Sequence, residues 1–494
     1  MPTILGANSD TRIFPIDNSL RFNDGDSPDL KRLPSATGQS IKGSLSVWVK
    51  FSNDNTEVAI LGGFDNSGAD DNDGYLVVKR IAAGNLEFAG RDTVWLKTTQ
   101  LLRDTSAWYH IVLGIDTSLA TADDRQKLYI NGVQVTSFAT RNNATRFQDF
   151  PMNTTAGNDD ALLIGADEDT GGKGLFFDGY MADFYWIDQG QKEASDFGEF
   201  NDDGVWVPTA YTGAFGVNGV HLEFKGTGTS ADSSGIGADT SGNDLHFTVT
   251  NLTALDVTTD TCTNNFCTLN YLDKDTTIPT LAEGNLDYHS INGTQFNPVR
   301  STFAVTKGKW YAEWKYINTA GFLGVISTQS PLTGNIASDA DVRSILRIPA
   351  GLYAGRNNSG GFTDVGDNSQ TFSDNDIGQV ALDMDNGFVY FGINGTYLKG
   401  QDGSTTGDPA GNNGGAGGSA NHPSQLMTAQ HDGVIAFMAG DFTQNTTGQI
   451  QCNFGNPPYA ISSGNADADG HGNFEFAVPS GFFALCTKNL GKYG

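Results

Sequence analysis

The feature of the sequence that most limits its fold is an Asn-Gly pair, Asn131-Gly132, between two runs of β-forming residues. Residues 127–135 read Lys-Leu-Tyr-Ile-Asn-Gly-Val-Gln-Val. Asn and Gly tolerate the positive φ angles of a two-residue primed turn, and such a turn joins neighbouring antiparallel strands. The segment therefore predicts a β-hairpin within an antiparallel sheet.

Other segments show the same preference for strands. Leu45, Val47, Val49 and Phe51 alternate with small or polar residues, which is the period of a strand that is buried on one face. Short apolar runs recur at residues 58–61, 75–78, 86–89, 108–115, 162–165 and 179–187. Glycine accounts for 62 of the 494 residues, which suits many short strands joined by tight turns. The pattern predicts an all-β protein.

A second series of strands follows in the C-terminal part of the chain. Residues 308–314 read Gly-Lys-Trp-Tyr-Ala-Glu-Trp and alternate aromatic with polar side chains. Residues 380–391 form a predicted hairpin with Asn386-Gly387 at its turn, and Asn394-Gly395 marks the next turn. A second sandwich is therefore expected here.

The length of the chain sets the number of folded units. A chain of 494 residues is too long for one ordinary hydrophobic core, so two or three packed units are expected. The strand series place sandwiches at residues 1–197 and 298–494. Residues 198–297 are rich in Gly, Ser and polar residues, which predicts a loop-rich connecting region with short strands.

Charge and apolar runs exclude some classes of function. The chain has 29 Lys and Arg against 57 Asp and Glu, a formal charge of -28, which repels phosphate backbones and anionic bilayers. No segment approaches the about 18 consecutive apolar residues of a membrane span, and no secretory signal is recognised. Binding to nucleic acid and insertion into a membrane are therefore not expected. The four cysteines lack metal-site spacing and are expected as buried thiols.

Three motifs in order carry a family resemblance in the first sandwich. They are Trp-Tyr-His-Ile-Val at residues 108–112, Leu-Tyr-Ile-Asn-Gly at residues 128–132 and Phe-Asp-Gly-Tyr-Met-Ala-Asp-Phe at residues 177–184. The series resembles the laminin-G and concanavalin A-like sandwiches. The resemblance implies an antiparallel jelly-roll sandwich that binds glycans or proteins.

The second sandwich resembles a different family. The hairpin at residues 380–391, Asn-Phe-Gly at residues 453–455 and Pro-Ser-Gly-Phe-Phe-Ala-Leu at residues 479–485 are similar to SPRY-domain motifs. That family recognises peptides or proteins with variable loops at one end of its sandwich. The resemblance implies two antiparallel jelly-roll-type sandwiches in one chain, without naming any contact residue in the second.

Three further segments resemble tail-fibre-like virion structural proteins of marine bacteriophages. They are Ser-Leu-Arg-Phe-Asn-Asp-Gly-Asp-Ser-Pro at residues 19–28, Tyr-Thr-Gly-Ala-Phe-Gly-Val-Asn-Gly at residues 211–219 and Thr-Asn-Asn-Phe at residues 263–266. The resemblance implies a non-enzymatic adhesin on the virion surface, at the tail or capsid exterior, that recognises a host-surface glycan or protein. Other virion proteins are its expected partners, a homo-oligomer such as a trimer is expected, and assembly takes place in the host cytoplasm without a signal peptide.

Two alternatives to the adhesin remain open. A capsid appendage or decoration protein would hold neighbouring subunits and would not need a host ligand. A glycan depolymerase ranks last, because it needs an acid and a second carboxylate in one cleft and no strand shows the alternating carboxylates of such a pair. The usual nucleophile, metalloprotease and phosphate-loop motifs are also missing from the sequence, so no catalytic residue is predicted.

One loop resembles a calcium site in the spacing of its oxygen ligands. Asn465, Asp467 and Asp469 alternate before a glycine, as the first ligands of a calcium loop do. The closing carboxylate belongs at the twelfth position, which is Phe476, whereas Glu475 comes one residue early. The candidate ligands are therefore Asn465, Asp467, Asp469 and Glu475, and an ordinary turn without metal is the alternative.

Tryptophan rings are the candidate sugar-stacking groups. Trp108, Trp186, Trp310 and Trp314 stand within alternating strands, so we expect them in the cores. Trp95 follows a loop and is the candidate binding residue.

Overall fold

The structure is a computed structural model that divides the chain into two compact units between Asn264 and Asn265. We call the unit that ends at Asn264 the first sandwich and the unit that contains residues 265–494 the second sandwich. The structure describes residues 14–34, 36–64, 74–152, 160–275, 279–290, 296–318, 321–332, 342–348, 351–356, 362–364, 373–398, 407–412, 433–441 and 448–494.

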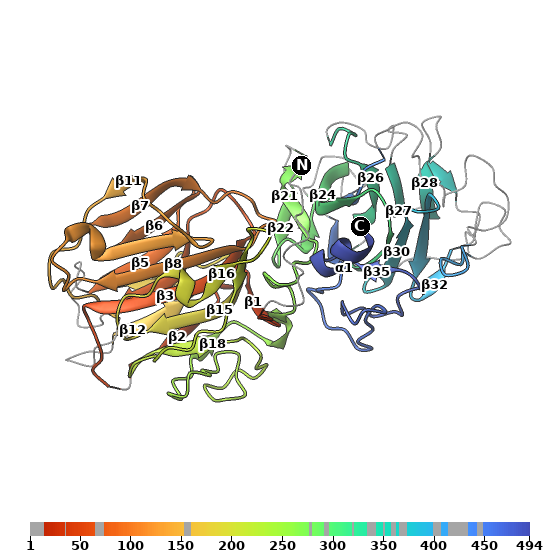
Figure 1. Ribbon diagram of the computed structural model, residues 1–494. Helices are drawn as coiled ribbons and strands as arrows, with labels where there is room; N and C mark the ends of the chain where they lie inside the picture. Colours follow the sequence, from red (N-terminus) through yellow and green to blue (C-terminus); the bar gives the residue numbers. More distant parts are fainter. Residues whose placement is uncertain are drawn as a thin grey trace. The chain divides into compact units, whose positions relative to one another are not determined.

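The first sandwich contains two large antiparallel sheets, coloured red to green in Figure 1. The sheet that we call the β8 sheet has the order β10 (Val133–Gln134), β9 (Gln126–Ile130), β8 (Tyr109–Asp116), β3 (Lys42–Phe51), β15 (Gly179–Ile187), β1 (Ser19–Phe22) and β20 (Val257–Thr258), with β18 (Val220–Leu222) also paired to β15. The sheet that we call the β5 sheet has the order β11 (Phe138–Arg141), β7 (Val94–Leu101), β6 (Asn85–Ala89), β5 (Tyr75–Arg80), β4 (Val58–Phe64), β12 (Ala161–Ile164), β2 (Asp29–Arg32) and β19 (Thr248–Thr250). Smaller pairs are β13 (Asp167–Asp169) with β14 (Gly172–Gly174) and β16 (Gly198–Phe200) with β17 (Trp206–Pro208).

The core of the first sandwich lies between these two sheets. Leu45, Val47, Val49 and Phe51 of β3 share one hydrophobic cluster with strands of the β5 sheet. Because successive side chains of a strand point to opposite faces, the intervening residues of β3 lie on the outer face of the β8 sheet. The alternation in the sequence therefore predicted the buried face correctly.

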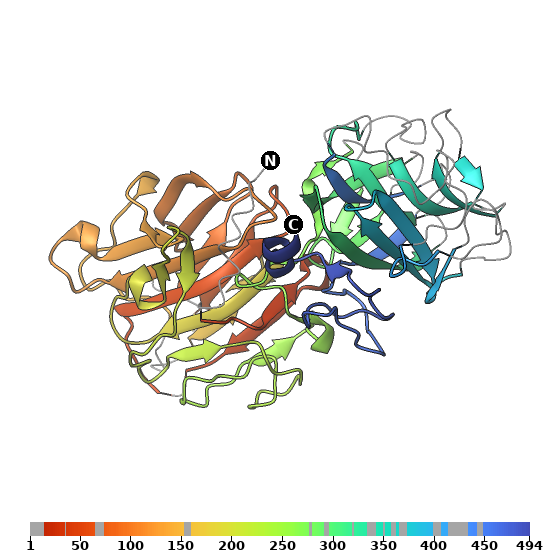
Figure 2. The ribbon, with the colours of Figure 1, turned by 45° about the vertical axis from the view of Figure 1, so that its right-hand side comes forward.

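Residues 194–215, together with the residues around Cys262, cover parts of the outer face of the β8 sheet. Phe197, Tyr211 and Phe215 from this segment pack with Tyr129 of β9 and Tyr185 of β15. Figures 1 and 2 show the β16–β17 hairpin in front of the β8 sheet. The sheet is therefore buried on both faces where this segment lies.

The second sandwich also contains two sheets. One has the order β21 (Leu269–Lys274), β24 (Phe296–Val305), β33 (Ile435–Asp441), β26 (Gly321–Ser327), β27 (Val342–Ile348), β28 (Gly351–Arg356) and β29 (Phe362–Asp364). The other has the order β22 (Thr280–Ala282), β23 (Asp287–His289), β34 (Gln449–Asn453), β25 (Lys309–Asn318), β30 (Ile377–Asp383), β31 (Phe388–Ile393) and β32 (Thr396–Tyr397), with β35 (Phe483–Ala484) parallel to β25. Trp310 and Trp314 are fully buried in its core, and helix α1 (Thr487–Tyr493) follows β35.

The nearly all-β class and the antiparallel sandwiches confirm the predicted fold class. The expected connecting region differs from the structure in detail. Residues 198–264 supply β16 to β20 to the first sandwich, and residues 265–297 supply β21 to β23 and the start of β24 to the second. Strands of two to six residues are too short for their alternation to be recognised in the sequence. In the part of the chain that the structure describes, no helix has the length and apolarity to cross a bilayer.

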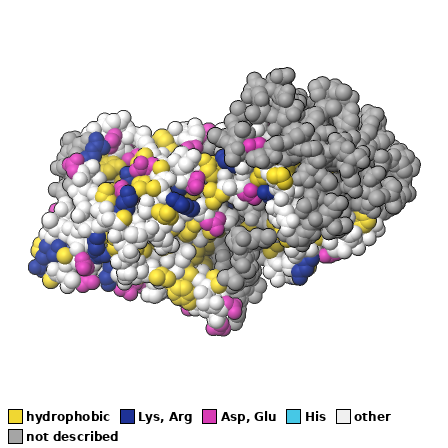
Figure 3. Space-filling model, turned by 90° about the horizontal axis from the view of Figure 1, so that it is seen from above, with side chains coloured by type: hydrophobic (Ala, Val, Ile, Leu, Met, Phe, Trp, Pro, Cys, Tyr) yellow, Lys and Arg dark blue, Asp and Glu magenta, His cyan; other side chains and the backbone are white. Residues whose placement is uncertain are grey.

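The surface of the chain mixes charged and hydrophobic side chains. On the face drawn in Figure 3, hydrophobic side chains lie among charged ones of both signs. Two of the most exposed large hydrophobic residues are Val133, at 61%, and Phe200, at 52%. Scattered exposed apolar residues are normal, so these two matter only if they adjoin a cavity.

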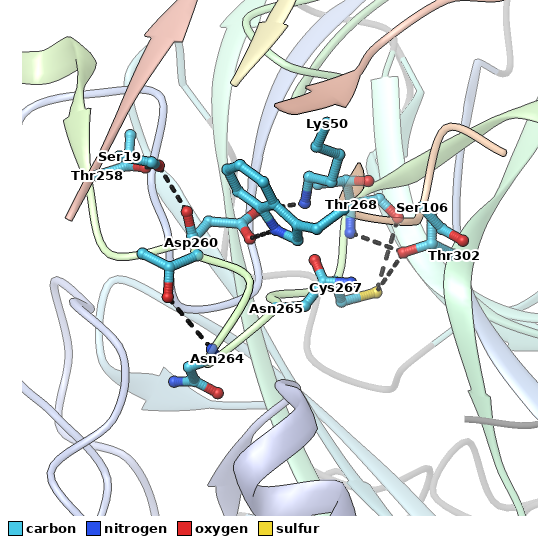
Figure 4. Close-up of polar contacts among 12 residues, drawn as sticks. Ser19, Lys50, Ser106, Thr258, Asp260, Asn264, Asn265, Cys267, Thr268 and Thr302 are labelled. Carbon is cyan, nitrogen blue, oxygen red and sulfur yellow. Dashed lines mark hydrogen bonds and ion pairs between the residues drawn. The ribbon is translucent and has the colours of Figure 1, made fainter. Parts of the chain in front are cut away.

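A buried ion pair holds residues 258–260 near the end of the first sandwich. Lys50 of β3 donates to a carboxylate oxygen of Asp260 over 2.5 Å, and the two side chains are 2% and 0% exposed. The indole of Trp108 donates to the other oxygen at 3.3 Å. Figure 4 shows Asp260 between Lys50 and the hydrogen-bonded pair of Ser19 and Thr258. Residues 258–260 are thereby held to both β1 and β3.

Candidate functional site

A cavity of about 480 Å³ opens on the covered face of the β8 sheet. It lies between the β9–β10 hairpin, the 3-10 turn η4 (Ala194–Asp196) and the β16–β17 hairpin. Its lining residues are Tyr129, Gly132, Glu193, Ala194, Ser195, Gly198, Glu199, Phe200, Trp206 and Thr209. We call this cavity the hairpin pocket.

Two aromatic rings form the apolar part of the hairpin pocket. Phe200 and Trp206 are directly opposite in the β16–β17 register, so their side chains lie on the same face of the hairpin. Their ring centroids are 5.0 Å apart at 66°. Trp206 is half-buried, whereas Phe200 is exposed. The pair therefore offers an aromatic surface to a ligand from solvent.

Two glycines allow the Trp206 ring to lie close to the sheet. A Cβ atom added to Gly132 would stand 2.1 Å from the ring, and one added to Gly198 would stand 2.5 Å from it. Gly132 also has a φ of 78° in the turn after β9, which favours glycine. The Asn131-Gly132 turn thus closes the β9–β10 hairpin and also leaves room for the Trp206 indole.

A buried histidine fixes the orientation of the same indole. Trp206 Nε1 donates to His110 Nδ1 at 2.9 Å, and an indole can only donate. His110 Nδ1 must therefore accept, so the proton resides on Nε2, which lies 2.8 Å from Ser46 Oγ. Burial lowers the pKa of His110 to about 3, and the ring stacks on Trp48 at 4.7 Å. His110 is thus a neutral support beneath the pocket.

Polar groups surround the aromatic pair. Glu193 and Glu199 are exposed to solvent, and Ser195 and Thr209 add hydroxyl groups. Burial, and next the carboxylate of Glu193, raises the pKa of Tyr129 to about 12, so its hydroxyl stays protonated. The site combines flat apolar rings with hydrogen-bonding groups, which is the composition of small-ligand sites.

The structure corrects the interpretation of Trp95 as a binding residue. Its side chain is 3% exposed and belongs to the core of the first sandwich. Phe88 and Phe150 each pack against it with ring centroids 4.9 Å away. Trp95 is therefore out of reach of a sugar. Trp108, Trp186, Trp310 and Trp314 are buried as predicted.

Hydrogen bonds or an ion pair engage each of the four candidate calcium ligands. Asp467 accepts hydrogen bonds from the backbone N–H groups of Asp469, His471 and Ala484 and from the Asn489 amide. The remaining three ligands contact different groups. Asp469 pairs with Lys492, Glu475 accepts from Ser462, and Asn465 donates to the Glu475 carbonyl. Among the described residues, no group of three or more His, Cys, Asp or Glu is placed to hold a metal. Calcium binding stays a prediction from the sequence.

Replacing Asp467 with asparagine is expected to lower the free energy of unfolding of the second sandwich by about 1–3 kcal/mol, because buried donors lose a charged acceptor. Asp469→Asn is the control in the same loop, since its solvent-exposed pair with Lys492 should contribute little to stability. Hydrogen exchange of peptides from residues 462–490 measures the change in both variants.

Thermal unfolding with calcium and with chelator tests the predicted metal site. A calcium-dependent rise in the unfolding temperature that both variants lose would support it.

A model of the concanavalin A-like lectin/glucanases superfamily matches residues 25–190. This confirms the concanavalin-like fold that the sequence predicted for that segment. Tyr129 and Gly132 of the hairpin pocket lie within the match, whereas Glu193 to Thr209 lie beyond it. None of the curated proteins matches the chain.

Solved structures show distant similarity only. A putative carbohydrate-binding protein of Bacteroides ovatus is 15% identical over 48% of this chain and 58% of that one, with a TM-score of 0.33. The SPRY domain of human HERC1 is 13% identical over 36% of this chain and 96% of that one, with a TM-score of 0.26. The sialidase module CBM40 of Ruminococcus gnavus bound to α2,3 sialyllactose is 17% identical over 30% and 75%, with a TM-score of 0.22. At these scores the similarities carry no argument about function.

Proposed function

We propose that the chain is a non-enzymatic glycan-binding protein whose hairpin pocket holds a sugar against Phe200 and Trp206. The observation that carries the proposal is this aromatic pair, which borders a cavity that also presents hydroxyl and carboxylate groups. A flat ring suits the apolar C–H face of a pyranose, while the polar groups orient its hydroxyls. The match of residues 25–190 to a superfamily described by lectins and glucanases supports the same ligand class.

We further propose that the protein acts on the surface of a virus particle, as a tail-fibre or tail-associated adhesin. The support is the resemblance of residues 19–28, 211–219 and 263–266 to tail-fibre-like proteins of marine phages. A shallow glycan site binds weakly, so many copies per particle would raise the avidity without new contacts. Immunogold labelling of particles from the culture that carries the gene tests the location. Labelled particles whose cell attachment is unaffected by added free protein would instead favour a capsid appendage.

A glycan depolymerase is the second candidate, because two glutamates, Glu193 and Glu199, line the same cavity. Glycosidases place a carboxylic acid and a second carboxylate on either side of the scissile bond. Both glutamates are exposed, and Glu193 lies 3.4 Å from Lys127, so neither has the apolar surroundings that usually prepare a catalytic acid. We therefore expect no new reducing ends when the protein is incubated with a glycan that it binds. Release of reducing ends, lost in Glu199→Gln, would establish hydrolysis.

Replacing Phe200 with alanine is expected to weaken glycan binding about tenfold, since it removes the exposed half of the aromatic surface. A glycan array identifies the ligand, and calorimetry then compares the variant with Leu101→Ala. Leu101 is also exposed, but it is the last residue of β7 in the β5 sheet. Leu101→Ala should therefore leave the affinity for the glycan unchanged. Equal affinities of the two variants would place the ligand outside the hairpin pocket.

A further inference from the structure

The charge of the hairpin pocket points to the class of glycan that it accepts. The ten lining residues include two glutamates and no lysine or arginine. Recognition of a ligand carboxylate or sulfate normally uses an arginine fork or a lysine. The pocket therefore lacks the groups that an acidic sugar needs.

The lysine that pairs with a lining residue is already engaged. Lys127, on β9 beside Tyr129, lies 3.4 Å from the Glu193 carboxylate. An acidic ligand would have to compete with Glu193 for it. Among the described residues, Glu199 forms no ion pair with a lysine or arginine, so no neighbouring cation neutralises its negative charge at the pocket lining.

Further carboxylates lie close to the lining residues in the sequence. Asp196 accepts from the backbone N–H of Glu193 in η4, and Asp202 and Asp203 are exposed in the turn between β16 and β17. The whole chain carries a formal charge of -28. Such a field repels anionic ligands and attracts cationic ones over a distance set by the salt concentration.

We infer that the hairpin pocket selects neutral and amino-sugar glycans and rejects sialylated, uronic and sulfated ones. This inference rests on the proposed function, because it assumes that the pocket holds a glycan. A ligand ammonium group can donate to Glu199, whereas a ligand carboxylate meets like charge and finds no free cation in the lining. The two aromatic rings serve both classes alike, so the charge alone separates them.

The test is an array of matched glycans, in which each neutral chain is paired with its sialylated or sulfated counterpart and each N-acetylated chain with its de-N-acetylated one. We expect each acidic member to bind up to about fivefold more weakly than its neutral counterpart, since one exposed charge contributes up to about 1 kcal/mol. The difference should shrink at about 1 M salt, where the Debye length falls to about 3 Å. Acidic members that bind as well as their counterparts would overturn the inference and leave the proposed function standing. If no glycan of any class binds, the proposed function itself fails.

Glu199→Gln assigns the selectivity to the pocket. The substitution keeps the size of the side chain and removes its charge, so the ratio of acidic to neutral affinity should rise about fivefold. Glu223→Gln is the control, because Glu223 pairs with Lys225 and does not line the pocket, while the change in total charge is the same. A ratio that changes equally in both variants would attribute the selectivity to the overall charge and would contradict a pocket-based origin.

Discussion

Replacing Lys50 with methionine is expected to lower the free energy of unfolding of the first sandwich by about 3–5 kcal/mol. Methionine fills much of the same volume, but it leaves the carboxylate of Asp260 without its cation. That carboxylate is completely buried and still accepts a hydrogen bond from the Trp108 indole. The loss is large because an unpaired buried charge keeps its desolvation penalty and loses its attraction.

Hydrogen exchange of peptides from residues 42–51 and 255–264 measures the effect within the first sandwich. Lys225→Met is the matched control, because its pair with Glu223 is exposed and should contribute at most about 1 kcal/mol. The double variant Lys50→Met with Asp260→Leu should recover most of the loss, since it removes both charges. A Lys50→Met protein as stable as the control would show that Asp260 is solvated or protonated in the native state.

The second sandwich is expected to lose stability, on the order of 3 kcal/mol, as the pH rises from about 4.5 to about 7, through one buried group. Burial raises the pKa of Glu313 from 4.5 to about 7, although the backbone N–H groups of Phe476 and Glu475 and the Tyr311 hydroxyl partly oppose this. The folded state therefore holds the proton more tightly than the unfolded state. The stabilisation is complete below the unfolded pKa and is lost as the pH rises through the folded one.

Glu313→Gln removes this contribution and should flatten the profile. Exchange of peptides from residues 309–318 and 470–478, corrected for intrinsic exchange rates, gives the opening free energy at each pH. The difference between the wild-type and variant profiles isolates Glu313 from the other carboxyl groups. Glutamine places a second donor against one N–H group, so the variant is expected to be less stable overall. Parallel profiles would mean that Glu313 is ionised throughout this range.

The hairpins were the part of the fold that the sequence determined best. Asn131 and Gly132 adopt φ angles of 47° and 78°, and Asn394 and Gly395 adopt 47° and 83°, as the primed turns require. Ile130 pairs with Val133 across the first of these turns. A turn that needs positive φ angles favours Asn and Gly, so it can be recognised in the sequence without knowledge of the rest of the chain.

The candidate site was beyond the same reasoning, because it depends on contacts between distant segments. Phe200 and Trp206 stand in strands of three residues, where alternation gives no signal. The only clue was Asn201-Asp-Asp-Gly204, a turn sequence between two aromatic residues. Nothing in the sequence indicated that Trp206 reaches His110, which is 96 positions away. Trp95 failed for the opposite reason, since a position after a loop does not reveal that two phenylalanines cover the ring.

The origin of the pocket in two separate stretches of chain has a consequence for how its ligand could change. The sandwich supplies the floor, and the β16–β17 hairpin, beyond residues 25–190, supplies Glu199, Phe200 and Trp206. The core between the sheets contains none of these three side chains. Changes in the β16–β17 hairpin during evolution can therefore give the protein a new ligand without disturbing the core of the sandwich. The tryptophan that donates to His110 would need to be kept.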